Sequence, residues 1–179
     1  MMEPQKTSWL DMRKRGIWIV AFLVVSIGLM AVGTFMPVNR IEARTTYQEL
    51  QNQFQYIATL PGIFGNNFFH SLIMFTPFIE PLYGALIFFN TGYVVAIIAA
   101  GAPTPVDAGS LFVRLFLFPH TWLELFAYAL ALSQSVFFAM AIVKGRFKQE
   151  AVRTCVIIAI CALILLLAAL LEVILIAIS

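Results

Sequence analysis

Charged residues are scarce in this sequence, because Asp, Glu, Lys and Arg make up only 11% of its 179 residues. Ordinary soluble domains carry about 25%. Hydrophobic residues make up 61%, and the mean hydropathy is +0.93. A water-exposed surface cannot be built from this composition, so the chain is not a soluble globular domain. The formal net charge of +2 is also too small to indicate a nucleic-acid partner.

Cysteines and catalytic motifs are scarce as well. Cys155 and Cys161 are six residues apart on an expected helix, where they lean toward different faces, and no disulfide between them is expected. The sequence contains no HExxH, GxSxG or Walker motif, and His120 with Glu124 has no third metal ligand at a recognisable spacing. The sequence therefore predicts no catalytic residue, no metal site and no cofactor, and the protein is not expected to be an enzyme.

Long apolar runs are what the sequence does contain. Five of them are long enough for transmembrane helices, at about residues 16–36, 63–79, 82–100, 120–143 and 154–178. Prolines and glycines separate the runs and mark the places where helices end. The first run follows basic residues, as in a signal peptide, but its length of about twenty residues is enough to cross a bilayer. It is expected to be a retained first helix.

Two further segments do not fit a transmembrane helix. Residues 40–60 combine charged residues and glutamines with an apolar stripe at helical spacing, which is typical of an amphipathic helix. Residues 111–118 are too few to span a bilayer and indicate a re-entrant or interfacial helix. Glu80, which lies between Pro77 and Pro81, is expected in a solvated turn. The prediction is a single integral membrane domain over residues 1–179, all-α, with about five transmembrane helices, an external amphipathic helix and one short helix.

Lys and Arg residues divide unequally between the two sides of the predicted bundle. One side holds eight of them: Lys6, Arg13, Lys14, Arg15, Lys144, Arg146, Lys148 and Arg153. The other side holds three: Arg40, Arg44 and Arg114. Because cytoplasmic loops carry the excess of basic residues, the N-terminus is expected in the cytoplasm and the C-terminus outside the cell membrane.

Six polar residues lie within or beside the expected transmembrane helices, and we call them the Glu124 cluster: Asn66, Asn67, His70, His120, Glu124 and Glu172. An ionisable side chain at mid-membrane costs about 2.5–3.5 kcal/mol on insertion scales, so each needs a partner or a function. A rise of about 1.5 Å per residue gives His70, Glu124 and Glu172 a similar depth on three helices. Two interpretations stay open: the groups hold the helices together, or they form a cation or proton site. In a connected cluster, His70 and Glu124 should be energetically coupled.

The polar face of the fourth predicted helix continues beyond His120 and Glu124. Ala127, Ala131 and Gln134 or Ser135 follow at helical spacing. Small and polar residues let membrane helices approach closely and form hydrogen bonds with one another. This face is therefore expected to point into the bundle.

A set of motif residues runs through most of the chain. They are Phe64, Asn66, Asn67, Tyr83, Gly84, Asn90, Gly92, Pro119, His120, Trp122, Glu124, Leu125, Ala168, Ala169 and Glu172. The set resembles the stage II sporulation protein M family of integral membrane proteins, and its Pro-His-x-x-x-Glu-Leu element is the most specific part. Thr121 departs from the family, which usually has glycine after the histidine. The resemblance implies a multi-pass membrane protein that works with partner proteins, and the sporulation role is not carried over.

Two functions compete at this point. The sequence favours a non-enzymatic membrane scaffold or assembly subunit, which contacts the lipid bilayer and either copies of itself, as a homo-oligomer, or other membrane proteins. The alternative is a small ion channel or a proton- or cation-coupled transporter that uses the Glu124 cluster. That alternative calls for an oligomer, because five helices enclose little space.

Overall fold

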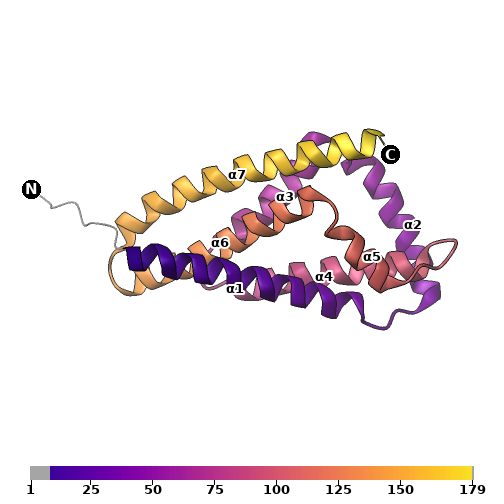
Figure 1. Ribbon diagram of the computed structural model, residues 1–179, viewed down its shortest axis with the longest axis horizontal. Coiled ribbons are helices and arrows are strands. Elements are labelled where there is room, and N and C mark those ends of the chain that lie inside the picture. Colours follow the sequence, from indigo (N-terminus) through magenta and orange to yellow (C-terminus); the bar gives the residue numbers. More distant parts are fainter. Residues whose placement is uncertain (1–8, 179) are drawn as a thin grey trace, which may run out of the picture.

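The computed structural model describes residues 9–178, and every regular element within them is a helix (Figure 1). In chain order the helices are α1 (Trp9–Thr34), α2 (Arg40–Ile57), α3 (Leu60–Met74), α4 (Glu80–Gly101), α5 (Ala108–Leu115), α6 (Pro119–Val143) and α7 (Phe147–Ile178). Lys6, one of the eight basic residues assigned to the cytoplasmic side, lies outside the described residues. The all-α prediction is confirmed for residues 9–178.

Four helices are long and apolar enough to cross a membrane. They are Met12–Thr34 within α1, and the whole of α4, α6 and α7. Their outward faces carry exposed apolar side chains, such as Val24, Leu82 and Leu163, which water would solvate poorly and lipid would cover. These are the features of a membrane-embedded protein.

The second predicted transmembrane helix, residues 63–79, is shorter in the structure. α3 ends at Met74, and residues 75–79 form a turn. Pro77 interrupts helical hydrogen bonding, and Phe78 adopts a left-handed backbone conformation with φ 72°. With 15 residues α3 is about 22 Å long, less than the hydrocarbon thickness of about 30 Å, and it is not one of the four long apolar helices.

The other predicted boundaries shift by at most three residues, except at the beginnings of α1, which starts at Trp9 instead of near residue 16, and of α7. That helix begins at Phe147 instead of near residue 154, because its polar first turns pack against α6 instead of forming a loop. The amphipathic segment predicted at 40–60 becomes α2, which ends at Ile57. The short run predicted at 111–118 falls largely in α5, which Asp107 caps by accepting a hydrogen bond from the Ser110 backbone N–H at 2.7 Å.

α1 and α4 run in the same direction through the bundle. Near their beginnings, Arg15 and Glu80 both face residues 133–135 of α6. Farther along both helices, the hydroxyl of Thr34 at the end of α1 donates to the carbonyl of Gly92 in the middle of α4 at 3.2 Å. We name the two ends of the bundle. The basic end is the one at which α1 and α7 begin, and the α2 end is the opposite one, at which α2 lies (Figure 1). α6 runs back toward the basic end, and α7 packs along it and returns toward the α2 end.

Glycines allow α1 and α4 to touch backbone to backbone. A Cβ atom at Gly92 would overlap the Met30 carbonyl, and one at Gly33 would overlap the Phe89 carbonyl. Gly84, about two turns before Gly92 in α4, lies against the Leu132 side chain of α6. Close approach at small residues is how helices gain packing energy in lipid, where the hydrophobic effect does not drive association.

Candidate functional site

A polar network joins α1, α6 and α7 at the basic end. We call it the Arg15 clasp, and it consists of Arg15, Gln134, Glu150, Arg153 and Thr154. Arg15 Nη1 donates to Gln134 Oε1, and Arg15 Nη2 donates to Glu150 Oε1, both at 2.6 Å. The guanidinium also lies over the ring of Phe137, 4.1 Å from its centroid. One arginine thus contacts two other helices through charge, hydrogen bonds and an aromatic face.

Gln134 completes the clasp from the polar face of α6. Its amide Nε2 donates to Glu150 Oε1 and to Thr154 Oγ1, both at 2.9 Å, and the residue is only 2% exposed. Arg153 Nη1 donates to Glu150 Oε2 at 3.1 Å. The carboxylate of Glu150 is therefore held by two arginines and an amide, so its burial is compensated.

The sequence interpretation missed this network. It treated Arg15 and Arg153 only as markers of orientation, and it left Gln134 as one of two alternatives on the polar face of α6. A signal was present, because Glu150, Arg153 and Thr154 share one helical face just before a long apolar run. What the sequence could not show is that Arg15, more than a hundred residues earlier, reaches that face.

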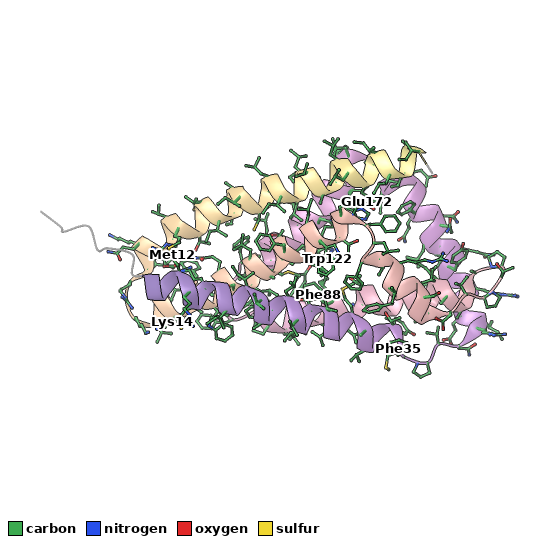
Figure 2. The ribbon with its side chains drawn as sticks, viewed as in Figure 1. Met12, Lys14, Phe35, Phe88, Trp122 and Glu172 are labelled. Carbon is green, nitrogen blue, oxygen red and sulfur yellow. The ribbon has the colours of Figure 1, made fainter. Side chains whose placement is uncertain are left out.

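The Glu124 cluster lies on the α2 side of the clasp, and the structure brings part of it together. Asn67 Nδ2 donates to Glu124 Oε1 at 2.6 Å, which links α3 to α6. Glu172 extends from α7 toward α3 and α6 (Figure 2), and its carboxyl lies within electrostatic range of the Glu124 carboxyl. Three helices therefore meet around Glu124.

The histidine of α3 takes a different partner. His70 Nδ1 lies 2.7 Å from the Tyr83 hydroxyl, which links α3 to α4, and no hydrogen bond among the described residues joins His70 to Glu124. Tyr128 is a neighbour of both pairs. Its phenol is close enough to Glu124, Tyr83 and Glu172 to interact with them electrostatically. Tyr128 is a member of this site that the sequence interpretation did not name.

Asn66 and His120 are at the margin of the cluster. Asn66 is exposed and donates only to the neighbouring Asn67, at 3.4 Å. His120 stacks against Phe118 with ring centroids 5.6 Å apart, and its buried Nδ1 has no hydrogen-bond partner among the described residues. The structure thus separates the predicted cluster into the Asn67–Glu124–Glu172 group, the His70–Tyr83 pair and two marginal residues.

Glu80 is not in a solvated turn, and that prediction was wrong. The residue is 3% exposed, and its carboxyl faces Ser135 of α6. Its neighbours in the turn, Phe78 and Ile79, are 66% and 53% exposed, so the physical reason is that Glu80 begins α4 and its own side chain packs against α6. Within residues 9–178, one carboxyl oxygen of Glu80 and the hydroxyls of Ser71 and Ser135 have no hydrogen-bond partner at 3.5 Å or less.

None of these networks has the composition of a metal centre. Within the described part of the chain, no group of three or more His, Cys, Asp or Glu side chains is placed to hold a metal ion. Both cysteines are free thiols, Cys155 exposed and Cys161 buried.

No protein-family model matches the chain, and no curated protein or solved structure matches it either. The resemblance to the stage II sporulation protein M family therefore rests on the sequence motifs alone.

Proposed function

We propose that the protein is a non-enzymatic scaffold or assembly subunit that crosses the membrane five times. Its N-terminus lies in the cytoplasm and its C-terminus outside. The partners are other membrane proteins or further copies of the same chain. The family resemblance adds that such proteins work with partner proteins.

The shared direction of α1 and α4 supports five crossings. Consecutive helices that cross a membrane alternate in direction, so the chain has to return to the basic end between α1 and α4. Of the two helices between α1 and α4, α2 stays at the α2 end. α3 is therefore the only described helix that can carry the chain back to the basic end. A short crossing helix is tolerated where neighbouring helices and local thinning of the bilayer satisfy its ends.

One observation carries the scaffold role: three sets of polar side chains inside the bundle bond to one another across helices. The Arg15 clasp joins α1, α6 and α7, Asn67 with Glu124 joins α3 to α6, and His70 with Tyr83 joins α3 to α4. Groups paired in this way fix the positions of the helices, and their hydrogen-bonding capacity is already used within the protein. The outward faces are left apolar and available to lipid or to other membrane helices.

The pair of carboxyl groups at Glu124 and Glu172 favours a second candidate. Among the described residues neither group forms an ion pair. Two carboxyls inside a membrane bundle without a cationic side chain are a typical place for a cation or a proton on an ion pathway. A channel or coupled transporter would use this pair.

Ion flux into liposomes tests the choice. The purified protein is reconstituted, and the movement of H⁺, Na⁺ and K⁺ is followed with dyes inside the vesicles, for the unchanged chain, Glu124→Gln and the matched control Glu49→Gln. Glu49 is exposed on α2, and no hydrogen bond or ion pair recorded among the described residues joins it to Glu124 or Glu172. A scaffold leaves vesicles as tight as protein-free ones. Flux that Glu124→Gln removes and Glu49→Gln preserves would replace the scaffold by the transport function.

Oligomeric state adds a second test of the scaffold role. The chain has a mass of 20.0 kDa, so light scattering of the detergent-solubilised protein separates a monomer from a homo-oligomer. A monomer at all concentrations would direct the search toward other membrane proteins as partners.

A further inference from the structure

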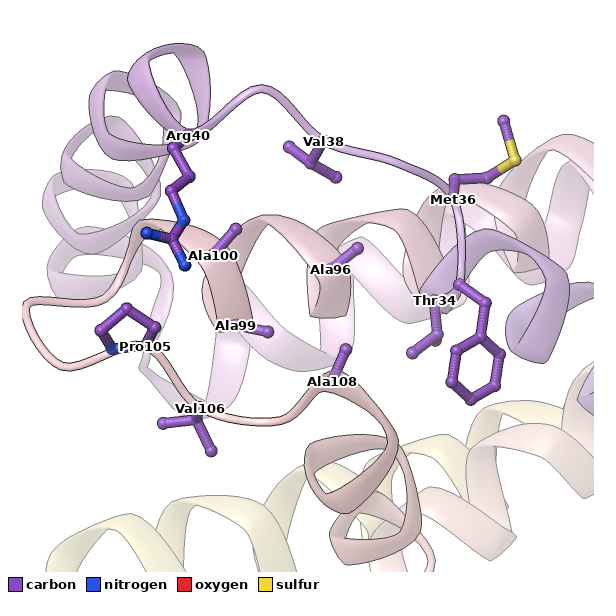
Figure 3. A pocket seen from close by; sticks show the side chains of 11 residues that line it. Thr34, Met36, Val38, Arg40, Ala96, Ala99, Ala100, Pro105, Val106 and Ala108 are labelled. Carbon is purple, nitrogen blue, oxygen red and sulfur yellow. The ribbon is translucent and has the colours of Figure 1, made fainter.

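A pocket of about 340 Å³ opens at the α2 end, where α1 and α4 finish and α2 and α5 begin (Figure 3). Its floor is formed by small side chains of α4, namely Ala96, Ala99 and Ala100, and Val106 and Ala108 form the facing wall. The volume lies in the range of about 300–1,000 Å³ that is usual for small-ligand sites. No buried charge or catalytic group lines it.

Arg40 supplies the positive charge of this pocket. Figure 3 shows its guanidinium above Ala100 and Pro105, at the mouth. None of the ion pairs recorded among residues 9–178 involves Arg40. No carboxylate lines the pocket, and Asp107, which stands in the chain between the lining residues Val106 and Ala108, caps α5 by accepting a hydrogen bond from the Ser110 N–H. The guanidinium is therefore free to bind an external anion.

The surroundings of the mouth are apolar, which limits the kind of anion. Phe35 and Met36 line the pocket and are 68% and 42% exposed. They follow directly on the last turn of α1, a membrane-spanning helix, so they lie at the boundary between hydrocarbon and headgroups. A ligand here meets a cation on one side and lipid-like surface on the other. That combination fits an amphiphile better than a water-soluble anion.

We propose that this pocket, which we call the Arg40 pocket, binds the phosphate of an anionic glycerophospholipid from the adjacent leaflet, with the acyl chains lying over Phe35 and Met36. Arginine suits this role because its planar guanidinium donates two parallel hydrogen bonds to phosphate oxygens. The inference is independent of the scaffold role, and it requires only that α1 and α4 end on the same side of the membrane, as the residues lining the pocket place them.

Native mass spectrometry of the detergent-solubilised full chain tests the proposal. The fraction of protein carrying lipid is measured during titration with phosphatidylglycerol, with phosphatidylcholine and with glycerol phosphate as a competitor. The variants are Arg40→Gln, the matched control Arg44→Gln, and Ala108→Phe, which fills the pocket and keeps its charge. Arg44 is exposed on the same helix and does not line the pocket.

Phosphatidylglycerol should bind in preference to phosphatidylcholine, and Arg40→Gln should weaken its binding about fivefold or more, since one basic residue at a membrane surface contributes about 1 kcal/mol. Arg44→Gln should stay within about twofold of the unchanged chain, and glycerol phosphate should not compete. Any one of four results would overturn the proposal: equal losses of binding in Arg40→Gln and Arg44→Gln, unchanged binding in Arg40→Gln, binding of phosphatidylcholine equal to that of phosphatidylglycerol, or competition by glycerol phosphate. If Ala108→Phe fails to fold, the comparison of the two arginine variants still decides.

Discussion

Arg15 and Glu150 are 135 positions apart in the chain, and the guanidinium of the first meets the carboxylate of the second at 2.6 Å. Their side chains are only 19% and 12% exposed. The pair ties the first long helix of the bundle to the last, and Gln134 of α6 lies between them with hydrogen bonds to both. A polar contact of this kind specifies which helices are neighbours, a choice that apolar faces in lipid leave open.

Removing the arginine should destabilise the fold measurably. We expect Arg15→Met to lower the free energy of unfolding by about 2–3 kcal/mol, because it leaves Glu150 and Gln134 buried with fewer partners. Arg13→Met is the matched control, since Arg13 is exposed on the same turn, and its effect should stay within about 0.5 kcal/mol. Equilibrium unfolding of the two detergent-solubilised variants measures both changes in the free energy of unfolding. Equal effects of the two substitutions would mean that the clasp contributes nothing specific.

The Glu124 cluster should show selective coupling. Asn67→Ala and Glu124→Gln should be non-additive, with a coupling energy of about 0.6–1.7 kcal/mol, the range found for hydrogen bonds between membrane helices. His70→Ala should couple more strongly to Tyr83→Phe than to Glu124→Gln, because His70 bonds Tyr83 directly. A double-mutant cycle in thermal unfolding measures each term. Strict additivity of Asn67 and Glu124 would contradict the hydrogen bond between them.

The α1–α4 contact should be intolerant of a single methyl group. Gly92→Ala places a Cβ atom on the Met30 carbonyl, so the helices must separate, and we expect a loss of about 1–3 kcal/mol. Gly28→Ala is the control, because a Cβ there meets nothing within 4 Å, and its helix propensity should make it neutral or slightly stabilising. Melting temperatures of the two variants decide. Similar melting temperatures would show that α1 and α4 do not approach as closely as described.

Much of the architecture follows from hydropathy alone. The apolar runs predict α1, α4, α6 and α7, because twenty apolar residues in lipid have few alternatives to a helix. The small and polar face of α6 also follows, and Ala127 and Ala131 are fully buried as that face predicts. Helix ends at prolines and glycines are correct to within a few residues.

What the sequence does not show are contacts that depend on how helices are placed side by side. Arg15 sits among other basic residues, and only the register of α1 against α6 distinguishes it from Arg13 and Lys14. Glu80 is typical of a turn residue in the sequence, and it is buried because it begins α4 with its side chain against α6. Hydropathy assigns each segment to lipid or water, but it does not say which buried groups meet.

The number of crossings is tested most directly by cysteine labelling in intact cells. In a chain whose two native cysteines are replaced, single cysteines are introduced at Glu42, Thr104 and Lys148, all exposed positions outside the four long apolar stretches or at their ends. Each variant is treated with a membrane-impermeant maleimide, before and after permeabilisation.

With five crossings and a cytoplasmic N-terminus, Glu42→Cys and Thr104→Cys label in intact cells, and Lys148→Cys labels only after permeabilisation. If α3 does not cross, Glu42→Cys still labels, but the other two exchange places, because every helix after α3 is then inverted. The five-crossing arrangement therefore predicts that Thr104→Cys labels in intact cells and that Lys148→Cys is protected. The reverse result, with Lys148→Cys labelled from outside and Thr104→Cys protected, would contradict it.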